Sequence, residues 1–547
     1  MSRRGGRTVG RLIADALALA GVRWAFTVPG ESFLELLDAL PAAGIRVVAT
    51  RHEGGAAFMA EAVGQLTGEP AAVLGTRTVG ASNMAIGIHT AYSNSTPMVA
   101  LLGDVQRSHA GREAFQESDL VTRFGRLAKW AARITDPHVA AAQLGEGLAA
   151  MRSGRPGPVL FALPEDVLLE RIPVRTRARV APTPPLVPDD AAVARVLALL
   201  ERARRPVILA GGGIMAADAR DDLVALSERL AVPVISTFRR PTAFPNDHPH
   251  YLGMTGFGAP SSVHTRLDEA DALLVIAARL NEIATFDYSV PRDGQRWAHV
   301  DLAPRARSVA GLRRANIAIS ADAGAFLRAA LKLSRDHMPR PGRAAAIAND
   351  RATYIADSTL PEDRAWRAPD VDPARAINVL QRLAPANSII TSDAGNFALW
   401  LSRGFRYAPA QDFLGPTSGA MGYGLPAAVA ASLVAPDRSV IAVCGDGGMA
   451  MTMNELETSV RSGATPVVLV FDNQRYGTIA MHQDNGGYAN TATELGPIDF
   501  AAVARAGGAQ GFRVTRNDEF EPTLRDALGS GATSVLHIDI DKRWVKP

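Results

Sequence analysis

The sequence contains a single cysteine, Cys444, among its 547 residues. One thiol excludes a disulfide within the chain and is typical of a reducing compartment such as the cytoplasm. An uninterrupted apolar run of about 20 residues, which a membrane-spanning helix needs, is also missing. The basic start MSRRGGRTVG lacks the apolar segment and cleavage site that would make it a signal peptide. We therefore expect a cytoplasmic protein that has no membrane partner.

Lysine is nearly absent, since residues 129, 332, 542 and 546 are the only lysines among 58 basic residues. The 55 acidic residues nearly balance them, and the formal net charge is only +3. Because the arginines are dispersed rather than clustered, the sequence predicts no nucleic-acid partner. A complete Gly-x-Gly-x-x-Gly after a predicted strand is also missing, which argues against a nicotinamide-dependent dehydrogenase.

The most informative stretch lies near the carboxyl end of the chain. An apolar run at residues 439–444 ends in Gly445-Asp446-Gly447-Gly448, which predicts a buried parallel strand followed by a glycine turn. Residues 449–461 have helical periodicity, and a second apolar run at 466–471 ends at Asp472-Asn473. Both strands of such a βαβ unit end at the same edge of the sheet. We therefore expect Asp446 and Asn473 to lie close together.

The residue types at this edge predict a metal–diphosphate site. Side-chain oxygens such as those of Asp446 and Asn473 are the ligands that Mg²⁺ prefers, together with phosphate oxygens and water. The glycines allow the backbone to approach a phosphate, and a helix that begins near Met449 would direct N–H groups at it. The simpler alternative is that Asp446 caps a helix and Asn473 occupies a turn.

A Gly-Asp-Gly followed by an asparagine 27 positions after the aspartate resembles the fingerprint of the thiamine diphosphate (ThDP) enzymes. The resemblance is to the superfamily of acetolactate synthase, pyruvate oxidase and pyruvate decarboxylase. It implies that Asp446, Asn473 and the backbone carbonyl of Arg475 bind Mg²⁺. The family usually has Asn-Asn where this chain has Asp472-Asn473. The residues that would line the diphosphate are Gly445, Gly447, Gly448 and Met449.

Glu53 is the candidate catalytic residue of the amino-terminal part. It follows the predicted strand at 45–50 and precedes a predicted helix at 56–66. The stretch RHEGGAAFMAEAVGQLTG resembles the family segment that carries the catalytic glutamate. That resemblance implies that Glu53 hydrogen-bonds N1′ of the ThDP pyrimidine and promotes removal of the proton from thiazolium C2. Without the resemblance, Glu53 could equally be an acidic residue favoured by a helix dipole.

Other segments resemble the family's cofactor and substrate contacts. The stretch TRTVGASN resembles a glycine-type turn beside the cofactor, which would place Asn83 there. The stretch AFQE matches the acetolactate synthase group, in which the equivalents of Phe115 and Gln116 line the substrate pocket. No histidine pair of the pyruvate decarboxylase kind is found near it, which favours carboligation over aldehyde release. His482 could contact substrate, although a surface histidine explains it as well.

Two further segments of the carboxyl-terminal part complete the predicted cofactor site. The strand predicted at 388–392 is followed by Asp393-Ala394-Gly395-Asn396, and the resemblance implies that Gly395 and Asn396 touch the diphosphate. In the segment PTSGAMGYG, the resemblance places the Gly419 carbonyl against the 4′-amino group and Met421 beneath the bent cofactor. Ordinary core packing is the alternative for Met421.

Strands and helices alternate along the whole chain, which predicts three doubly wound α/β domains with parallel sheets. The resemblance implies ThDP-binding folds for the first and third domains and a Rossmann-like central domain. Gly211–Gly213 is not a full dinucleotide fingerprint, so we expect a structural spacer, with FAD binding as the less favoured alternative. The predicted boundaries are a pyrimidine-binding domain at 1–170, a linker at 171–190, the central domain at 191–334, a linker at 335–368 and a diphosphate-binding domain at 369–547.

The resemblance implies ThDP- and Mg²⁺-dependent decarboxylation of a 2-oxo acid with carboligation to a second carbonyl compound. It also implies a homodimer or homotetramer whose active sites lie between subunits. One alternative is a decarboxylase or lyase that acts on another 2-oxo acid or on a 2-hydroxyacyl-CoA. A catalytically silent binding protein of the same fold is another, although the presence of Glu53, Asp446 and Asn473 argues against it.

Overall fold

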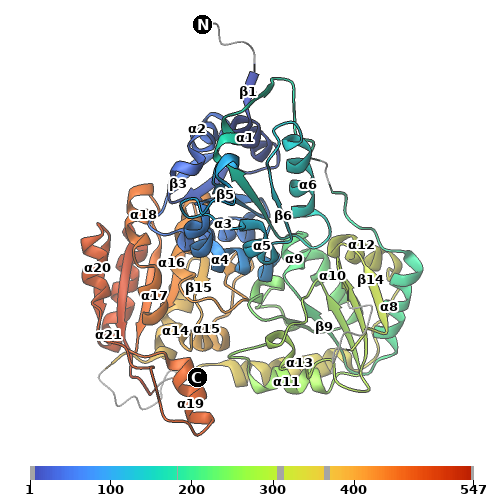
Figure 1. The fold of residues 1–547 in the computed structure, drawn as a ribbon. Helices are drawn as coiled ribbons and strands as arrows, with labels where there is room; N and C mark the ends of the chain where they lie inside the picture. Colours follow the sequence, from blue (N-terminus) through green and yellow to red (C-terminus); the bar gives the residue numbers. More distant parts are fainter. Residues whose placement is uncertain (1–5, 181–182, 305–312, 362–369, 544–546) are drawn as a thin grey trace.

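The structure is a computed structural model that describes residues 6–180, 183–304, 313–361, 370–543 and 547. In these residues the strands form three six-stranded parallel sheets and one two-stranded antiparallel sheet. Helices cover both faces of each large sheet (Figure 1). The prediction of three doubly wound α/β domains is confirmed. The basic start at 1–5 and residues 362–368 of the predicted second linker lie outside the described residues.

The amino-terminal sheet has the strand order β3-β2-β4-β5-β7-β6. Its strands are apolar runs, and every residue of β5 and β7 is buried because helices pack on both sides. The elements of this domain are β2 (Trp24–Thr27), β3 (Arg46–Ala49), β4 (Ala71–Thr76), β5 (Met98–Asp104), β6 (Trp130–Arg133), β7 (Pro158–Pro164), α1 (Val9–Leu19), α2 (Leu34–Ala42), α3 (Glu53–Thr67), α4 (Arg77–Asn94), α5 (Leu120–Phe124), α6 (Ala140–Arg152) and α7 (Glu165–Leu169).

The carboxyl-terminal sheet repeats this plan, since its order β16-β15-β17-β18-β20-β19 is the same pattern counted from its own first strand. The two domains thus share one topology although their strand-end residues differ. The elements are β15 (Ile389–Ser392), β16 (Asp412–Leu414), β17 (Val440–Gly445), β18 (Val467–Asp472), β19 (Gln510–Val514), β20 (Ser534–Asp539), α14 (Pro373–Leu383), α15 (Phe397–Gly404), α16 (Gly424–Val434), α17 (Asp446–Thr452), α18 (Glu455–Ser462), α19 (Gly477–Asn485), α20 (Phe500–Ala506) and α21 (Asn517–Gly529).

The central sheet has the order β11-β10-β9-β12-β13-β14, which is the Rossmann order with its reversal between β9 and β12. The Rossmann-like prediction for this domain is therefore confirmed. Its elements are β9 (Pro206–Ala210), β10 (Val234–Ser236), β11 (Tyr251–Met254), β12 (Ala272–Ile276), β13 (Arg296–Asp301), β14 (Ile317–Ser320), α8 (Asp190–Arg202), α9 (Gly213–Ala216), α10 (Arg220–Leu230), α11 (Ser261–Asp268), α12 (Ala323–Leu333) and α13 (Arg343–Ser358).

The segments between the domains carry structure of their own. Strand β8 (Arg171–Pro173) pairs antiparallel with β1 (Gly6–Thr8) and ties the two ends of the amino-terminal domain together. Helix α13 packs beside α11 below the central sheet (Figure 1), and its Tyr354 is buried in the core of that domain. Both segments thus extend the packing of the domains that they follow.

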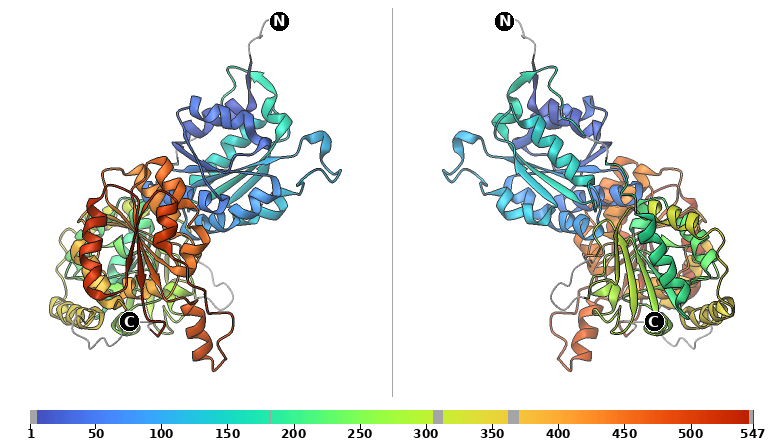
Figure 2. Two further views of the ribbon diagram at one scale, coloured as in Figure 1. Left: turned by 90° about the vertical axis from the view of Figure 1, so that its left-hand side faces the viewer. Right: turned by 90° about the vertical axis from the view of Figure 1, so that its right-hand side faces the viewer.

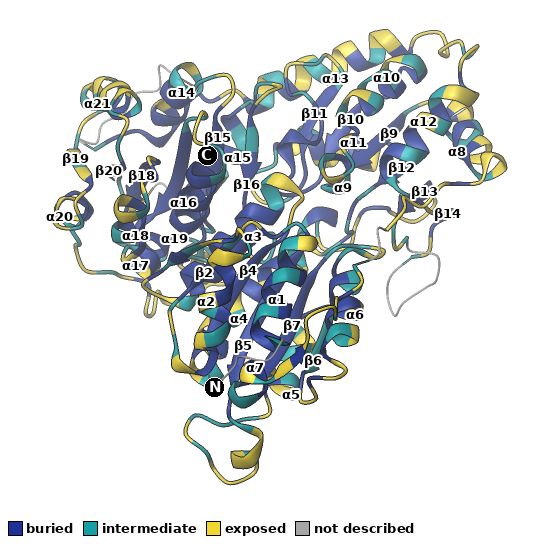
Figure 3. Ribbon diagram, turned by 90° about the horizontal axis from the view of Figure 1, so that it is seen from above, coloured by how far each residue is buried: buried dark blue, intermediate teal, exposed yellow. Residues whose placement is uncertain are grey.

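The amino- and carboxyl-terminal domains meet through α3 and α16, which pack against each other. Seen from above, both helices lie among buried residues at the centre of the molecule (Figure 3). Tyr423, at the start of α16, donates its hydroxyl to Glu61 of α3 at 2.6 Å. The Tyr423 ring also meets Phe58 edge to face, with centroids 5.5 Å apart. This helix pair sets the position of the two sheets relative to each other.

Two local predictions were wrong. Helix α17 begins at Asp446, not near Met449, and the periodic segment breaks into α17 and α18. The stretch TRTVGASN is not a turn but the start of α4, which begins at Arg77. In both cases glycines suggested a turn, whereas the structure uses them where neighbouring segments leave no room for a Cβ. None of the described helices is long and apolar enough to cross a membrane.

Candidate active site

Asp446 and Asn473 follow adjacent paired strands, β17 and β18, at the same sheet edge, as the βαβ pattern predicts. Both side chains are buried. The backbone N–H of Arg475 donates to Asp446 Oδ2 at 3.2 Å, so the turn after Asn473 folds back onto the start of α17. The structure therefore brings together the three residues that the resemblance identifies as metal ligands.

The electrostatics of this edge favour a cation. Burial raises the pKa of Asp446, and the neighbouring carboxylate of Asp472 raises it further. Two buried carboxylates beside each other repel, and a bound divalent cation would relieve that repulsion. The oxygen donors of Asp446 and Asn473 suit a hard cation such as Mg²⁺.

The glycines of this region fit segments together tightly. A Cβ on Gly447 would lie 2.7 Å from the Tyr476 ring and 3.3 Å from the Met421 Cε atom, and Gly448 has no room for one beside Asp393. A Cβ on Gly445 would lie 2.7 Å from the ring of Phe397. The predicted cofactor residues Gly445, Gly447, Gly448, Met449 and Met421 thus lie close to the predicted metal ligand Asp446.

Several buried polar atoms in the same region have no hydrogen-bond partner among the described residues. They include Nδ2 of Asn396, which is 7% exposed, and Oγ1 of Thr478. Asn396 lies against Gly477, the first residue of α19, and Thr478 follows directly. A buried donor without a partner is costly unless a ligand satisfies it. These atoms therefore fit a phosphate group, and Gly395 precedes Asn396 in the same loop.

Asp393 holds the loop at residues 393–396 together, and no sequence motif singled out this residue. Its carboxylate accepts hydrogen bonds from the backbone N–H groups of Ala394 at 2.7 Å, Gly422 at 2.9 Å and Tyr423 at 3.4 Å. It thereby joins the loop after β15 to the segment that carries Met421. Burial raises the pKa of Asp393 to about 6. Arg239 of the central domain donates to the Asp393 carbonyl at 2.9 Å from beneath.

The loop that carries Gly419 is held from outside its own domain. Asn94, at the end of α4, accepts hydrogen bonds from Thr417 N at 3.0 Å and from Arg240 Nη2 at 2.9 Å. All three domains therefore meet at Asn94. Gly419 itself is exposed and has a φ of +74°, which a side chain would strain.

Glu53 is the first residue of α3 at the carboxyl end of β3, and it is half-buried. Asn83 of α4 donates its Nδ2 to Glu53 Oε2 at 2.9 Å. A Cβ on Gly80 would lie 3.4 Å from Glu53 Oε1, so α4 passes close to the carboxylate. The structure thus brings Glu53 and Asn83 together, at the edge of the amino-terminal sheet.

The segment before Glu53 is fixed by a residue that the sequence did not single out. Glu455, at the start of α18, is fully buried and accepts from His52 N at 3.0 Å and from Arg51 N at 3.2 Å. A Cβ on Gly55 would lie 2.6 Å from Glu455 Oε1. The carboxyl-terminal domain therefore sets the position of the backbone that carries Glu53.

The predicted substrate residues lie in exposed segments. Phe115 is 73% exposed on the loop between β5 and α5, which protrudes from the amino-terminal domain in light blue (Figure 2). The Gln116 carbonyl accepts from Thr78 N at 3.4 Å, which places this loop against the start of α4, near Asn83. His482 lies elsewhere, exposed on α19, which projects from the carboxyl-terminal domain (Figure 2).

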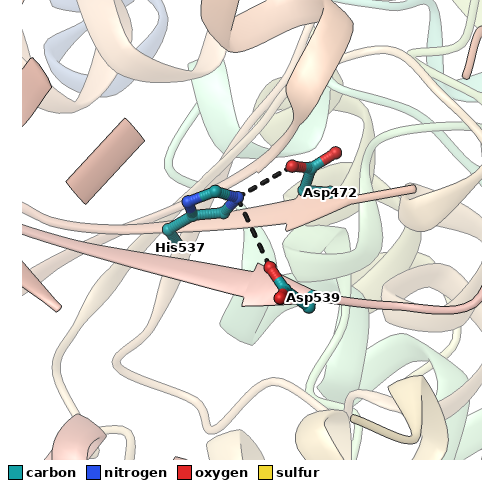
Figure 4. Close-up of side chains that lie close together, drawn as sticks. All are labelled: Asp472, His537 and Asp539. Atoms are coloured by element: carbon teal, nitrogen blue, oxygen red, sulfur yellow. Dashed lines mark hydrogen bonds and ion pairs between the residues drawn. The ribbon is translucent and has the colours of Figure 1, made fainter. Parts of the chain in front are cut away.

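Asp472 and His537 form a pair that only the structure reveals. Asp472 is the last residue of β18, and His537 lies on the neighbouring strand β20. His537 Nε2 lies 2.8 Å from Asp472 Oδ2 and 3.6 Å from Asp539 Oδ1 (Figure 4). No local sequence pattern indicates this pair, because the two residues are 65 positions apart in the chain.

Sequence models of the thiamine pyrophosphate enzymes match three parts of the chain. The amino-terminal TPP-binding domain matches residues 7–122, the central domain 193–330 and the carboxyl-terminal TPP-binding domain 393–538. Each range covers most strands of one six-stranded sheet, and the first and third ranges contain Glu53 and the Asp446–Asn473 pair respectively.

Several relatives cover nearly the whole chain. A probable acetolactate synthase large subunit of Methanocaldococcus jannaschii is 30% identical, over 98% of this chain and 92% of the relative. The acetolactate synthase isozyme 2 large subunit of Escherichia coli is 29% identical, over 97% and 95%. A sulfoacetaldehyde acetyltransferase of Rhodobacter capsulatus is also 29% identical, over 96% and 93%. The chain therefore belongs to the thiamine pyrophosphate enzyme family, and it is a ThDP-dependent enzyme similar to the acetolactate synthases.

Proposed function

We propose that the chain catalyses the ThDP- and Mg²⁺-dependent decarboxylation of a 2-oxo acid and joins the remaining fragment to a second carbonyl compound. The observation that carries this proposal is the convergence of Asp446, Asn473 and the Arg475 turn beside two unpartnered buried polar atoms. The relatives named as acetolactate synthases support the reaction class. The AFQE segment beside the start of α4 favours carboligation over simple decarboxylation.

The carboxyl-terminal edge would hold the charged end of the cofactor. Asp446 and Asn473 offer side-chain oxygens to Mg²⁺, and Arg475 offers its backbone carbonyl. Asn396 Nδ2 and Thr478 Oγ1 would donate to the diphosphate, which satisfies both atoms. Met421, packed over Gly447, would exclude water from this end of the site. When bound, ThDP supplies the nucleophilic carbon and takes up the electron pair that is left when CO₂ departs.

Glu53 would hold a proton at N1′ of the pyrimidine ring. Its carboxylate is oriented by the Asn83 amide, which leaves Oε1 free to face a ligand. A carboxylate held in one orientation is an effective proton carrier because no reorganisation is needed when the proton moves. Substrate would approach past the loop of Phe115 and Gln116, which borders the start of α4.

We also propose that Glu53 of one copy serves the metal site of another, in a homodimer or homotetramer. Large apolar side chains are exposed beside both edges, with Val79 49% and Ile86 43% exposed on α4 and Met451 51% exposed on α17. Apolar surface of this kind marks an association face. Sedimentation equilibrium at two protein concentrations tests this proposal, and a monomer at both would contradict it.

The experiment that tests the reaction is product analysis. Purified protein with ThDP and Mg²⁺ is incubated with pyruvate, alone and with an added aldehyde, and products are separated by chromatography. We expect acetolactate from pyruvate alone and a mixed hydroxyketone when the aldehyde is present. Acetaldehyde as the sole product would favour the decarboxylase alternative. No consumption of pyruvate, with turnover of another 2-oxo acid or a 2-hydroxyacyl-CoA, would favour the lyase alternative.

For the central domain we propose a structural role without FAD. Arg239 of this domain donates to the carbonyl of Asp393, and Arg240 donates to Asn94. The central domain would thus position the two segments that carry these residues. The absorbance spectrum of the purified protein tests this. We expect no flavin bands, and flavin bands that persist through gel filtration would overturn the proposal.

A further inference from the structure

Asp472 introduces a second carboxylate beside the metal ligands, and both of its oxygens are already engaged. Oδ1 accepts from the backbone N–H of Gln474 at 2.9 Å, and Oδ2 accepts from His537 Nε2 at 2.8 Å. Gln474 has a φ of +52°, so the turn from Asp472 to Arg475 adopts a conformation that needs support. The Asp472 carboxylate supplies that support from within the turn.

His537 is placed by the sheet itself. Strands β18 and β20 pair in parallel, and their register sets Val470 opposite His537 and Asp472 opposite Asp539. His537 is 1% exposed, and its ring meets Phe500 edge to face with centroids 5.4 Å apart. A ring packed in this way can present only one nitrogen to Asp472. Since a carboxylate only accepts, Nε2 is the donor.

The energetic reason for the pair is the burial of Asp472. Asp472 is 6% exposed, and it lies directly before Asn473 and beside Asp446. A buried carboxylate without a hydrogen-bond donor is strongly destabilising, whereas an asparagine at the same position would carry no charge. His537 is the side chain that makes a carboxylate tolerable at this position.

We propose that His537 is a positioning residue that holds Asp472, and through it the turn that presents Asn473 and the Arg475 carbonyl to the metal. The proposal rests on the metal assignment of the proposed function. It states that His537 matters because residue 472 is an aspartate, so the two positions should act as one unit. Partners of metal ligands commonly change metal affinity by about 10–100-fold when they are removed.

The same three side chains, Asp472, His537 and Asp539, could also be regarded as a metal centre of their own, since their ligand atoms lie within 4.8 Å of one another. The His537 nitrogen that faces both carboxylates and one oxygen of Asp539 already have partners, which argues against this. His537 Nε2 donates to Asp472, and Arg513 Nη2 lies 3.0 Å from Asp539 Oδ2. We therefore infer that these side chains support the turn after β18 and do not form a separate metal centre.

The test is a double-mutant cycle with Asp472→Asn, His537→Leu and the double variant. The readout is the Mg²⁺ concentration that half-saturates ThDP binding, followed by isothermal calorimetry without substrate. We expect His537→Leu to raise this concentration at least about tenfold. Asp472→Asn alone should raise this concentration less than His537→Leu does, because the amide oxygen can still accept from the Gln474 N–H. In the Asp472→Asn background, His537→Leu should change the half-saturating Mg²⁺ concentration by less than about twofold, because residue 472 then carries no charge that needs the histidine N–H.

Two controls separate positioning from general destabilisation. His537→Gln retains a side-chain N–H and should restore most of the lost Mg²⁺ affinity. His299→Leu removes a buried strand histidine of the central domain, whose Nε2 lies 3.1 Å from the Ala278 carbonyl. It should lower Tm without changing the Mg²⁺ requirement. If His537→Leu fails to fold but the double variant folds, positions 472 and 537 are coupled in stability, which supports the pairing that the proposal requires.

The outcomes separate a failure of the metal assignment from a failure of the pairing between His537 and Asp472. If wild-type ThDP binding does not depend on Mg²⁺, the metal assignment of the proposed function fails. If wild type depends on Mg²⁺ but His537→Leu has the same effect in both backgrounds, the metal assignment stands and the pairing of His537 with Asp472 is wrong. A His537→Leu variant with wild-type Mg²⁺ affinity would also overturn the inference.

Discussion

The amino-terminal and carboxyl-terminal sheets share one strand order, yet the residues at their strand ends differ in burial and packing. The carboxyl-terminal edge is closed within one chain, with buried carboxylates, tightly packed glycines and a loop held by Asp393. The amino-terminal edge is open, because Glu53 is half-buried and exposed apolar side chains of α4 flank it. The same topology thus has buried, tightly packed strand ends in the carboxyl-terminal domain and partly exposed ones beside Glu53 in the amino-terminal domain.

The largest effect is expected at the open edge. Glu53→Gln removes the carboxylate but keeps a side chain that Asn83 can still contact. We expect turnover to fall by about 10²–10⁴ while ThDP still binds, because the charged end of the cofactor is held by the other edge. Turnover from CO₂ release and ThDP binding by calorimetry check this. Wild-type turnover in this variant would refute the role assigned to Glu53.

At the closed edge the opposite pattern is expected. Asp446→Ala removes a buried oxygen ligand, so the Mg²⁺-dependent affinity for ThDP should fall at least about tenfold. Calorimetry with and without Mg²⁺ measures this. Asp518→Ala serves as the control, since it removes an exposed carboxylate of the same domain. Unchanged ThDP binding in Asp446→Ala would count against the metal assignment.

A pH series sharpens the description of the closed edge. Burial raises the pKa of Asp393 to about 6, so the folded chain favours its protonated form. The corresponding stability is fully present below about pH 4 and is lost as pH rises to about 6, by at most about 3 kcal/mol. Asp393→Asn has no such titration. In thermal unfolding of the metal-free chain, the Tm of Asp393→Asn should therefore rise relative to that of wild type between pH 4 and 6. A Tm difference that stays constant over this range would contradict this.

The smallest effect on stability is expected on the exposed loop. Phe115→Ala removes a side chain that is 73% exposed, although the Arg77 guanidinium lies over its ring with 5.9 Å to the centroid. The free energy of unfolding should change by no more than about 0.5 kcal/mol. The KM for the 2-oxo acid should rise. A large drop in stability with unchanged KM would make Phe115 a structural residue.

The sequence predicted the sheets well because most strands are short apolar runs, and β17 and β18 end at Gly445 and Asp472, which mark the strand ends. Asp446 and Asn473 could be brought together from that pattern alone, since strand ends of a βαβ unit share an edge. The sequence failed where glycine has a packing role. Gly447 and Gly448 suggested a turn on propensity, yet they lie in α17, at positions where Tyr476 and Asp393 leave no space for a Cβ.

Residues that act across domains carried no local signal. Asn94, Glu455 and Arg239 reach their partners over more than 150 residues of chain. No periodicity or spacing encodes such a contact, because it depends on how the α3–α16 pair sets the domains. His537 is a similar case, since only the register of β18 and β20 brings it to Asp472.

The lone thiol gives the chain a practical property. Cys444 is fully buried in β17, and burial raises its pKa, so maleimide reagents will not reach a reactive thiolate in the folded protein. A single cysteine introduced on the protruding loop between β5 and α5 would then carry a fluorophore alone. The separation of two such dyes in the proposed oligomer could be followed by energy transfer without first removing a native residue.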